Sequence, residues 1–124
     1  MKRDMDVIRK IILETAALPY GGQLQSIDGV EEDVFVMNVI WLEEAGLINA
    51  SAQAGSGSMA MYAIVTRLTW AGCEFADAIT DDTLWKKAKE TVFKPGISFT
   101  FDILKEWLKT EIKQGLPSIR SLGN

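Results

Sequence analysis

The fold is decided by residues 31–68, whose sequence is EEDVFVMNVIWLEEAGLINASAQAGSGSMAMYAIVTRL. Acidic residues open a helical segment over 31–45, where they favour the positive end of the helix dipole. Gly46 stands where a C-terminal glycine cap belongs. The next two segments, 47–52 and 59–68, are predicted strands, and the glycine- and serine-rich residues between them suit the tip of a hairpin. This stretch therefore predicts a helix followed by a β-hairpin.

Outside this stretch, hydrophobic spacing predicts further helices and one short strand. Apolar residues recur every three or four positions over 3–17, as they do on one face of a helix. A helix with Thr69 as its N-cap follows the hairpin, and helical segments also cover 83–93 and 100–114. The alternation of polar and apolar side chains over 23–27 predicts the short strand.

The order helix, short strand, helix, hairpin is that of a winged helix. We therefore predict an α+β, mostly helical, winged-helix-like domain with additional C-terminal helices. A chain of 124 residues suits a single domain, 1–124, with one hydrophobic core. We expect a winged-helix-like core over 1–68, C-terminal helices over 69–114 packed on it, and a tail over 115–124 that is free to move.

Charge is spread unevenly along the chain, whose net charge is −4. Residues 1–58 carry four basic and nine acidic side chains, a balance of −5, whereas residues 59–124 carry nine basic and eight acidic ones, a balance of +1. DNA is bound through clustered Lys and Arg, and a winged helix inserts the start of its recognition helix into the major groove. Because the helix 31–45 starts with acidic residues, the sequence disfavours DNA recognition by this helix.

The residue types argue against catalysis. The chain has no histidine and one cysteine, Cys73, which excludes Ser-His and Cys-His pairs and metal sites built from histidine or several cysteines. The apolar helical pattern around Cys73 predicts a small core residue at that position. The glycine-rich stretches lack the spacing of a phosphate-binding loop. We therefore expect no enzyme activity, no catalytic residue, no metal and no cofactor.

The sequence also bears on location. No apolar run approaches the ~20 residues that a membrane-spanning helix needs. The first residues, MKRD, lack the apolar stretch and cleavage site of a signal peptide. The single cysteine fits a reducing compartment. We expect a cytoplasmic protein that makes no contact with membranes.

The helix predicted over 31–45 is apolar on more than one face. Phe35, Val39 and Leu42 lie on one side, the natural core side, and other apolar residues spread well beyond it. Two interpretations stay open. The helices of the C-terminal half cover these residues, or they form an exposed patch that docks a partner or a second copy of the chain. In the second interpretation the anchors are Val36, Met37, Ile40 and Trp41.

A set of lysines in the C-terminal half is the alternative binding surface. These residues follow helical spacing and could meet phosphate groups, although Glu106 and Glu111 interrupt the row. An ordinary solvated helix face explains them more simply. The candidates for phosphate contact are Lys86, Lys87, Lys105, Lys109 and Lys113.

Motifs over most of the chain resemble those of one known family. They are MKRDMDVIRK at 1–10, LEEAGLI at 42–48, RLTWAGCEF at 67–75, DAI at 77–79 and DDTLW at 81–85. The family is the bacterial and phage-associated domain of unknown function 2513. The resemblance implies a winged-helix-like fold and frequent residence in prophages, without an established activity. The chain departs from the pattern at Cys73, where relatives often have histidine, and along 34–41, which is more apolar.

These observations lead to a hypothesis of function. We expect a non-enzymatic, phage- or prophage-type accessory protein that acts by protein–protein contact or self-association through the helix 31–45. The alternative is a winged-helix DNA-binding transcriptional regulator, in which basic side chains outside that helix meet phosphate. The expected partner is therefore a protein or a second copy of the chain, and nucleic acid stays open as the alternative.

Overall fold

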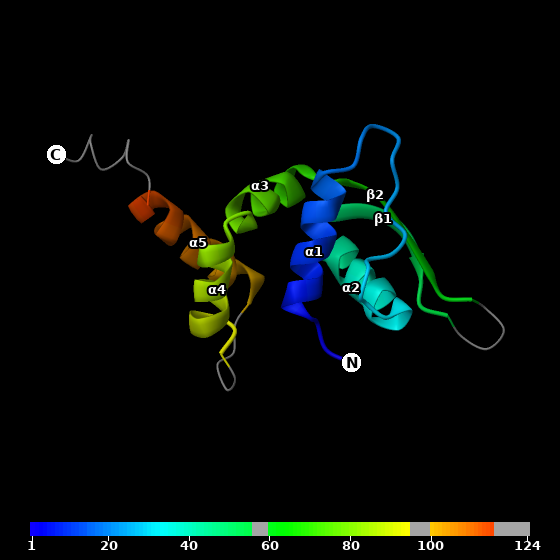
Figure 1. Cartoon of the computed structure of the whole chain (residues 1–124), viewed down its shortest axis with the longest axis horizontal. Helices are drawn as coiled ribbons and strands as arrows, with labels where there is room; N and C mark the ends of the chain where they lie inside the picture. Colours follow the sequence, from blue (N-terminus) through cyan, green and yellow to red (C-terminus); the bar gives the residue numbers. More distant parts are fainter. Residues whose placement is uncertain (56–59, 95–99, 116–124) are drawn as a thin grey trace. The chain divides into compact units, whose positions relative to one another are not determined.

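The structure is a computed structural model that describes residues 1–55, 60–94 and 100–115. Within these residues the chain is α+β and mostly helical, with five helices and one two-stranded antiparallel hairpin (Figure 1). The elements are α1 (Met5–Ala16), α2 (Glu32–Glu44), β1 (Ile48–Gln53), β2 (Tyr62–Leu68), α3 (Trp70–Ile79), α4 (Asp82–Thr91) and α5 (Phe101–Gly115). The predicted helices and hairpin are confirmed to within a few residues at their ends.

The contacts of the chain divide it into two compact units, residues 1–76 and residues 77–124. The first unit holds α1, α2, the hairpin and the beginning of α3, and the second holds α4 and α5. A single domain with C-terminal helices packed on a core over 1–68 stays a prediction. Of the predicted tail, Gly115 is the last residue of α5, and the rest lies outside the described residues.

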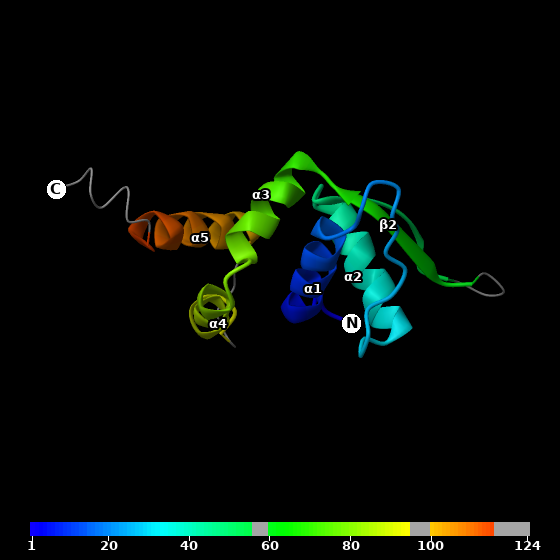
Figure 2. The same cartoon turned by 45° about the horizontal axis from the view of Figure 1, so that its top comes forward.

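The core of the first unit forms where α1 and α2 pack together and against the hairpin. In Figure 2 the two helices lie side by side on one face of the hairpin. Asp4 caps α1, because its side chain accepts hydrogen bonds from the backbone N–H groups of Asp6 and Val7. The buried residues of this core include Val7, Ile8, Ile11, Ile12, Phe35, Val39, Leu42, Ile48 and Val65. In α1 and α2 the buried residues are three or four positions apart, so each helix turns one apolar face inwards.

A tight turn joins α2 to the hairpin. Gly46 has a φ of +76°, its N–H donates to the carbonyl of Glu43, and the N–H of Leu47 donates to the carbonyl of Leu42. This pair of hydrogen bonds is a Schellman motif, in which the left-handed position favours glycine. The predicted glycine cap is confirmed. It brings Leu47 back to the start of β1, where the carbonyl of Leu47 accepts from the N–H of Thr69.

The hairpin carries a bulge near its base. Ile48 pairs with Leu68 and Asn49 with Arg67, but Ala50 pairs with Val65, so Thr66 is the extra residue. An extra residue shifts the alternation of side chains by one position. Leu68 therefore joins Val65 on the buried face. The short strand predicted over 23–27 is reduced to one antiparallel bridge, in which Leu24 and Val65 exchange two hydrogen bonds of 2.9 Å.

The helix α3 begins very close to the base of the hairpin. The predicted N-cap is confirmed, since the hydroxyl of Thr69 accepts from the N–H of Gly72 and donates to the carbonyl of Gly46. A Cβ placed on Gly72 would lie 1.9 Å from the carbonyl oxygen of Leu47, so only glycine permits this approach. The expectation that Cys73 is a core residue is wrong, because Cys73 is exposed. The residues of α3 that are buried are Gly72, Phe75, Ala76 and Ile79.

In the second unit a new helix begins directly after α3. Asp81 caps α4, and its carboxylate accepts from the N–H of Leu84 at 2.8 Å. Trp85 is buried, and its ring centroid lies 5.3 Å from that of Phe93. The other buried side chains of α4, α5 and the segment after α4 include Ala88, Val92, Leu104 and Leu108. These residues form a separate small core.

Candidate functional site on helix α2

The helix α2 is mostly buried, and one stripe of it reaches the surface. Phe35, Val39 and Leu42 are in the core, as predicted, at 2%, 0% and 2% exposure. Val36, which the docking interpretation placed on an exposed patch, is also in the core at 1% exposure and is therefore not part of the surface of α2. Because side chains 100° apart follow one another round a helix, Val36 lies on the flank of the core face.

The remaining predicted contact residues gather on the opposite side of α2. Met37, Ile40 and Trp41 are all half-buried. Residues three and four apart are neighbours on a helix surface, which places these three side chains in one cluster. Asp33 and Glu44 continue the same stripe at its two ends, and both are exposed. We call these five residues the α2 stripe.

The charge around the α2 stripe is negative at both ends. Glu31 and Glu32 are exposed beside Asp33 at the start of the helix, and Glu43 is exposed beside Glu44 at its end. The carboxylate of Glu43 accepts from the N–H of Ala50 at 3.1 Å, which fixes it near the start of the hairpin. An apolar centre with acidic ends is complementary to an apolar surface flanked by basic side chains.

A buried polar residue holds α2 against α1 behind the stripe. Asn38 is 0% exposed, its Nδ2 donates to the carbonyl of Val34 at 2.7 Å, and its Oδ1 accepts from the N–H of Asp4 at 3.0 Å. The bond to Asp4 joins residues 34 positions apart in the sequence. Since both polar ends of the amide are satisfied, Asn38 fixes how the first turn of α1 meets α2. Sequence reasoning missed this residue, because periodicity gives no sign of which distant group an amide will bond.

The predicted phosphate-contacting lysines belong to α4 and α5, and several of them have neighbours within the second unit. Lys87 pairs with Glu111 at 2.7 Å, and this ion pair joins α4 to α5. Lys109 lies 3.5 Å from Glu106. The Nζ of Lys105 lies 5.5 Å from the ring centre of Phe101. The other two predicted residues, Lys86 and Lys113, are exposed. Carboxylates therefore share this surface with the lysines, which weakens its attraction for phosphate.

Large aromatic side chains outside α2 are also exposed. Trp70, the first residue of α3, is 82% exposed, and Tyr62 on β2 is 42% exposed.

The glycine-rich hairpin tip predicted between the strands falls in part on residues 56–59, outside the described residues. In the part of the chain that the structure describes, no helix is long and apolar enough to cross a membrane.

Comparison with known proteins gives two relations. A family model described as "Hypothetical protein (DUF2513)" matches residues 2–98. The chain is also similar to an uncharacterised protein of Haemophilus influenzae (strain ATCC 51907 / DSM 11121 / KW20 / Rd), with 32% identity over 119 residues that cover 94% of this chain and 99% of that protein. No solved structure matches the chain.

Proposed function

This chain belongs to the family described as Hypothetical protein (DUF2513), as its motifs predicted, and we propose that it acts without catalysis, through a protein contact made by the α2 stripe. The proposal extends to a phage- or prophage-type accessory role, for which the support is the resemblance of its motifs. One observation carries it: Met37, Ile40 and Trp41 form a half-exposed apolar cluster between acidic ends.

The proposal includes a winged-helix fold for the first unit. In the first unit α1, the bridge at Leu24, α2 and the hairpin follow one another in the order of that fold, with α2 in the place of the recognition helix. The segment between the bridge at Leu24 and the start of α2 at Glu32 is too short for the full helix that usually precedes the recognition helix. On this view the fold keeps the position of the recognition helix and uses it for protein contact.

The charges favour a different protein over a second copy of this chain. A symmetric contact of two α2 stripes would place Asp33 beside Glu44 of the other copy when the helices run antiparallel, and Asp33 beside Asp33 when they run parallel. Either arrangement brings like charges together, which opposes association. A partner with basic residues around an apolar patch meets no such repulsion. Hydrophobic anchors such as Met and Trp supply the contact area.

The test compares the same substitution on two exposed helix faces. Ile40→Asp places a charge in the centre of the α2 stripe, and Ile103→Asp places one on α5, where Ile103 is 52% exposed. Each variant and the wild-type chain is used to recover partners from the source cells, and the recovered partner is then purified and its Kd measured. We expect Ile103→Asp to keep the wild-type Kd and Ile40→Asp to weaken it at least about tenfold.

Folding is the necessary control, because Ile40 is half-buried. Circular dichroism and thermal unfolding identify a variant that has lost its fold, and Met37→Glu supplies a second charge in the same cluster. A partner that binds both stripe variants as tightly as wild type contradicts the proposal. A dimer that Ile40→Asp dissociates would support self-association through the stripe and refute the preference for a different protein.

The winged-helix order of the elements also favours a second candidate, a DNA-binding transcriptional regulator. In that case the lysines of α4 and α5 would contact phosphate, with Lys86 and Lys113, both exposed, as the most available of the five. Random duplex DNA would bind with an affinity that falls steeply as salt rises, and Lys86→Gln with Lys113→Gln would reduce the salt slope by about two. The acidic start of α2 argues against this candidate, because it repels the DNA backbone.

A further inference from the structure

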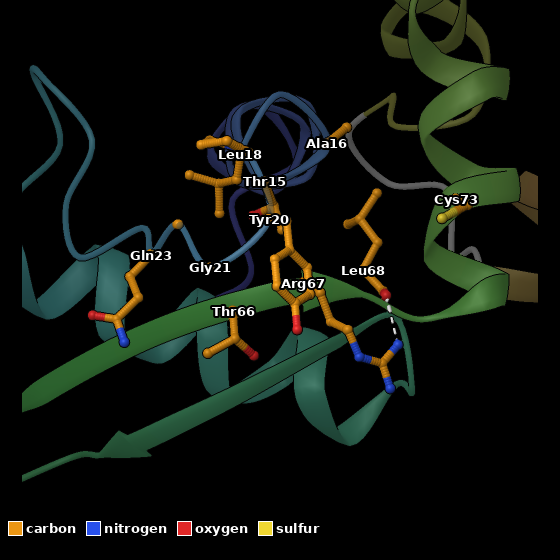
Figure 3. Close-up of a pocket in the computed structure, with 12 residues that line it drawn as sticks. Thr15, Ala16, Leu18, Tyr20, Gly21, Gln23, Thr66, Arg67, Leu68 and Cys73 are labelled. Atoms are coloured by element: carbon orange, nitrogen blue, oxygen red, sulfur yellow. Dashed lines mark hydrogen bonds between the residues drawn. The ribbon is translucent and has the colours of Figure 1, made fainter.

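A groove of about 580 Å³ lies in the first unit, away from the α2 stripe. Its walls are the last turn of α1, the loop that follows it, the end of β2 and one side of α3 (Figure 3). Ala16, Leu18, Pro19 and Leu68 make much of the lining apolar. Pockets of several hundred Å³ with an apolar lining and a few polar groups are typical of small-molecule sites.

Arg67 is the one charged side chain among the residues that line the groove. Its Nη1 donates to the carbonyl of Leu68 at 3.0 Å, the contact drawn in Figure 3. With the amide of Asn49 oriented so that its oxygen faces Arg67, this oxygen accepts from Nε at 3.2 Å and from Nη2 at 2.7 Å. Two neighbours therefore hold the guanidinium in place.

These contacts leave part of the guanidinium available. Of its five N–H groups, one on Nη1 and one on Nη2 have no acceptor among the described residues, and no described carboxylate lies within ion-pair distance of Arg67. Two N–H groups on one planar guanidinium match the two oxygens of a carboxylate. A fixed cation without an acidic partner, in a chain of net charge −4, points to an anionic ligand.

Tyr20 adds an aromatic surface to the groove. It lies between Pro19 and Gly21, lines the groove, and is fully exposed. Gly21 has a φ of +83°, a conformation that glycine adopts without strain. The turn therefore holds the ring away from the core of the unit, where an apolar group in the groove can stack on it.

From these contacts we propose that the groove binds a small organic monocarboxylate with an apolar or aromatic body. The carboxylate is held by the two available N–H groups of Arg67, and the body lies among Leu18, Leu68 and Tyr20. This binding site is separate from the α2 stripe, and neither proposal depends on the other.

The test uses two probes with the same apolar body and a similar shape, 3-phenylpropanoate and 3-phenylpropanamide; the second replaces the carboxylate by an uncharged carboxamide. Binding is followed by NMR on the backbone amides of Gly21, Gly22 and Arg67, which belong to residues that line the groove. A second readout is the rate at which a thiol reagent modifies Cys73, the single cysteine of the chain, which also lines the groove. At roughly millimolar concentration, 3-phenylpropanoate should shift the NMR signals of these backbone N–H groups and slow the modification of Cys73. We expect 3-phenylpropanamide to bind about tenfold more weakly.

Variants assign the preference to the guanidinium. Arg67→Gln should remove the difference between the two probes, and Arg67→Lys should restore part of it, because the lysine keeps the charge without the planar pair of donors. Lys113→Gln, which removes one positive charge on α5, should leave the difference unchanged. Equal binding of both probes by the wild-type chain, or no effect of either probe at roughly 10 mM, overturns the proposal. An unchanged acid preference in a folded Arg67→Gln variant does so too.

Discussion

Replacing Asn38 by alanine should loosen α1 from α2 and destabilise the chain strongly. In the wild-type structure the Oδ1 of Asn38 accepts the N–H of Asp4, and the side chain is 0% exposed. Alanine cannot accept this hydrogen bond, so the backbone N–H of Asp4, at the start of α1, is left without its partner. The carbonyl of Val34 also loses the hydrogen bond from the Nδ2 of Asn38, although Val34 remains part of α2.

The expected cost combines two effects. A donor left unsatisfied at a buried or part-buried position costs about 1–3 kcal/mol. The space left by the missing amide adds about 1 kcal/mol, because a packed core relaxes only in part. We therefore expect Asn38→Ala to lower the free energy of unfolding by about 2–4 kcal/mol, a large part of the roughly 5–15 kcal/mol that keeps a domain folded.

Urea unfolding followed by circular dichroism measures this change, and hydrogen exchange locates it. The control is Gln25→Ala, an exposed residue whose side chain bonds only to the nearby Gln23, and its effect should stay within about 0.5 kcal/mol. The amides of Asp4 and Ile8, at the start of α1, should exchange faster in Asn38→Ala. A cost no larger than that of the control, or unchanged exchange at these amides, would refute the role given to Asn38.

Two further predictions concern packing at other places. Gly72→Ala should lower the free energy of unfolding by about 3 kcal/mol in the same urea assay, because its Cβ would lie 1.9 Å from the carbonyl oxygen of Leu47. A loss under about 0.5 kcal/mol would mean that α3 does not approach the hairpin base so closely. Lys87→Ala should lower the free energy of unfolding by about 0.5 kcal/mol at low salt and by almost nothing at high salt, because the side chain of Lys87 is 56% exposed and that of Glu111 is 20% exposed. A loss of stability that salt leaves unchanged would contradict a screened ion pair.

The parts of the fold that sequence predicted well are those that depend on neighbouring residues. Periodic apolar residues placed α1 and α2, Gly46 marked the end of α2, and Thr69 marked the start of α3. Each of these signals acts over one or two helical turns, within which side chains and backbone hydrogen bonds are set by local geometry. The motif resemblance likewise gave the family that the comparisons support.

The parts that sequence did not predict depend on contacts between distant segments. An apolar pattern around Cys73 suggested a core position, but packing of α3 through Gly72 and Phe75 leaves the cysteine on the open side. Val36 looked like its neighbour Met37 in a continuous apolar run, and only the positions of α1 and the hairpin separate the two. The groove beside Arg67 likewise combines residues from four segments, so no single stretch of sequence announces it.

Photo-crosslinking in the source cells tests the role of the α2 stripe most directly. A photoreactive amino acid replaces Met37, and in a matched variant it replaces Ile103 on α5. If α2 is the contact surface, the variant at Met37 should form one defined crosslinked product with another protein, and Ile40→Asp should abolish it. The variant at Ile103 should form no such product. Absence of a product at Met37 in a folded chain, or the same product from both positions, would contradict the proposed function.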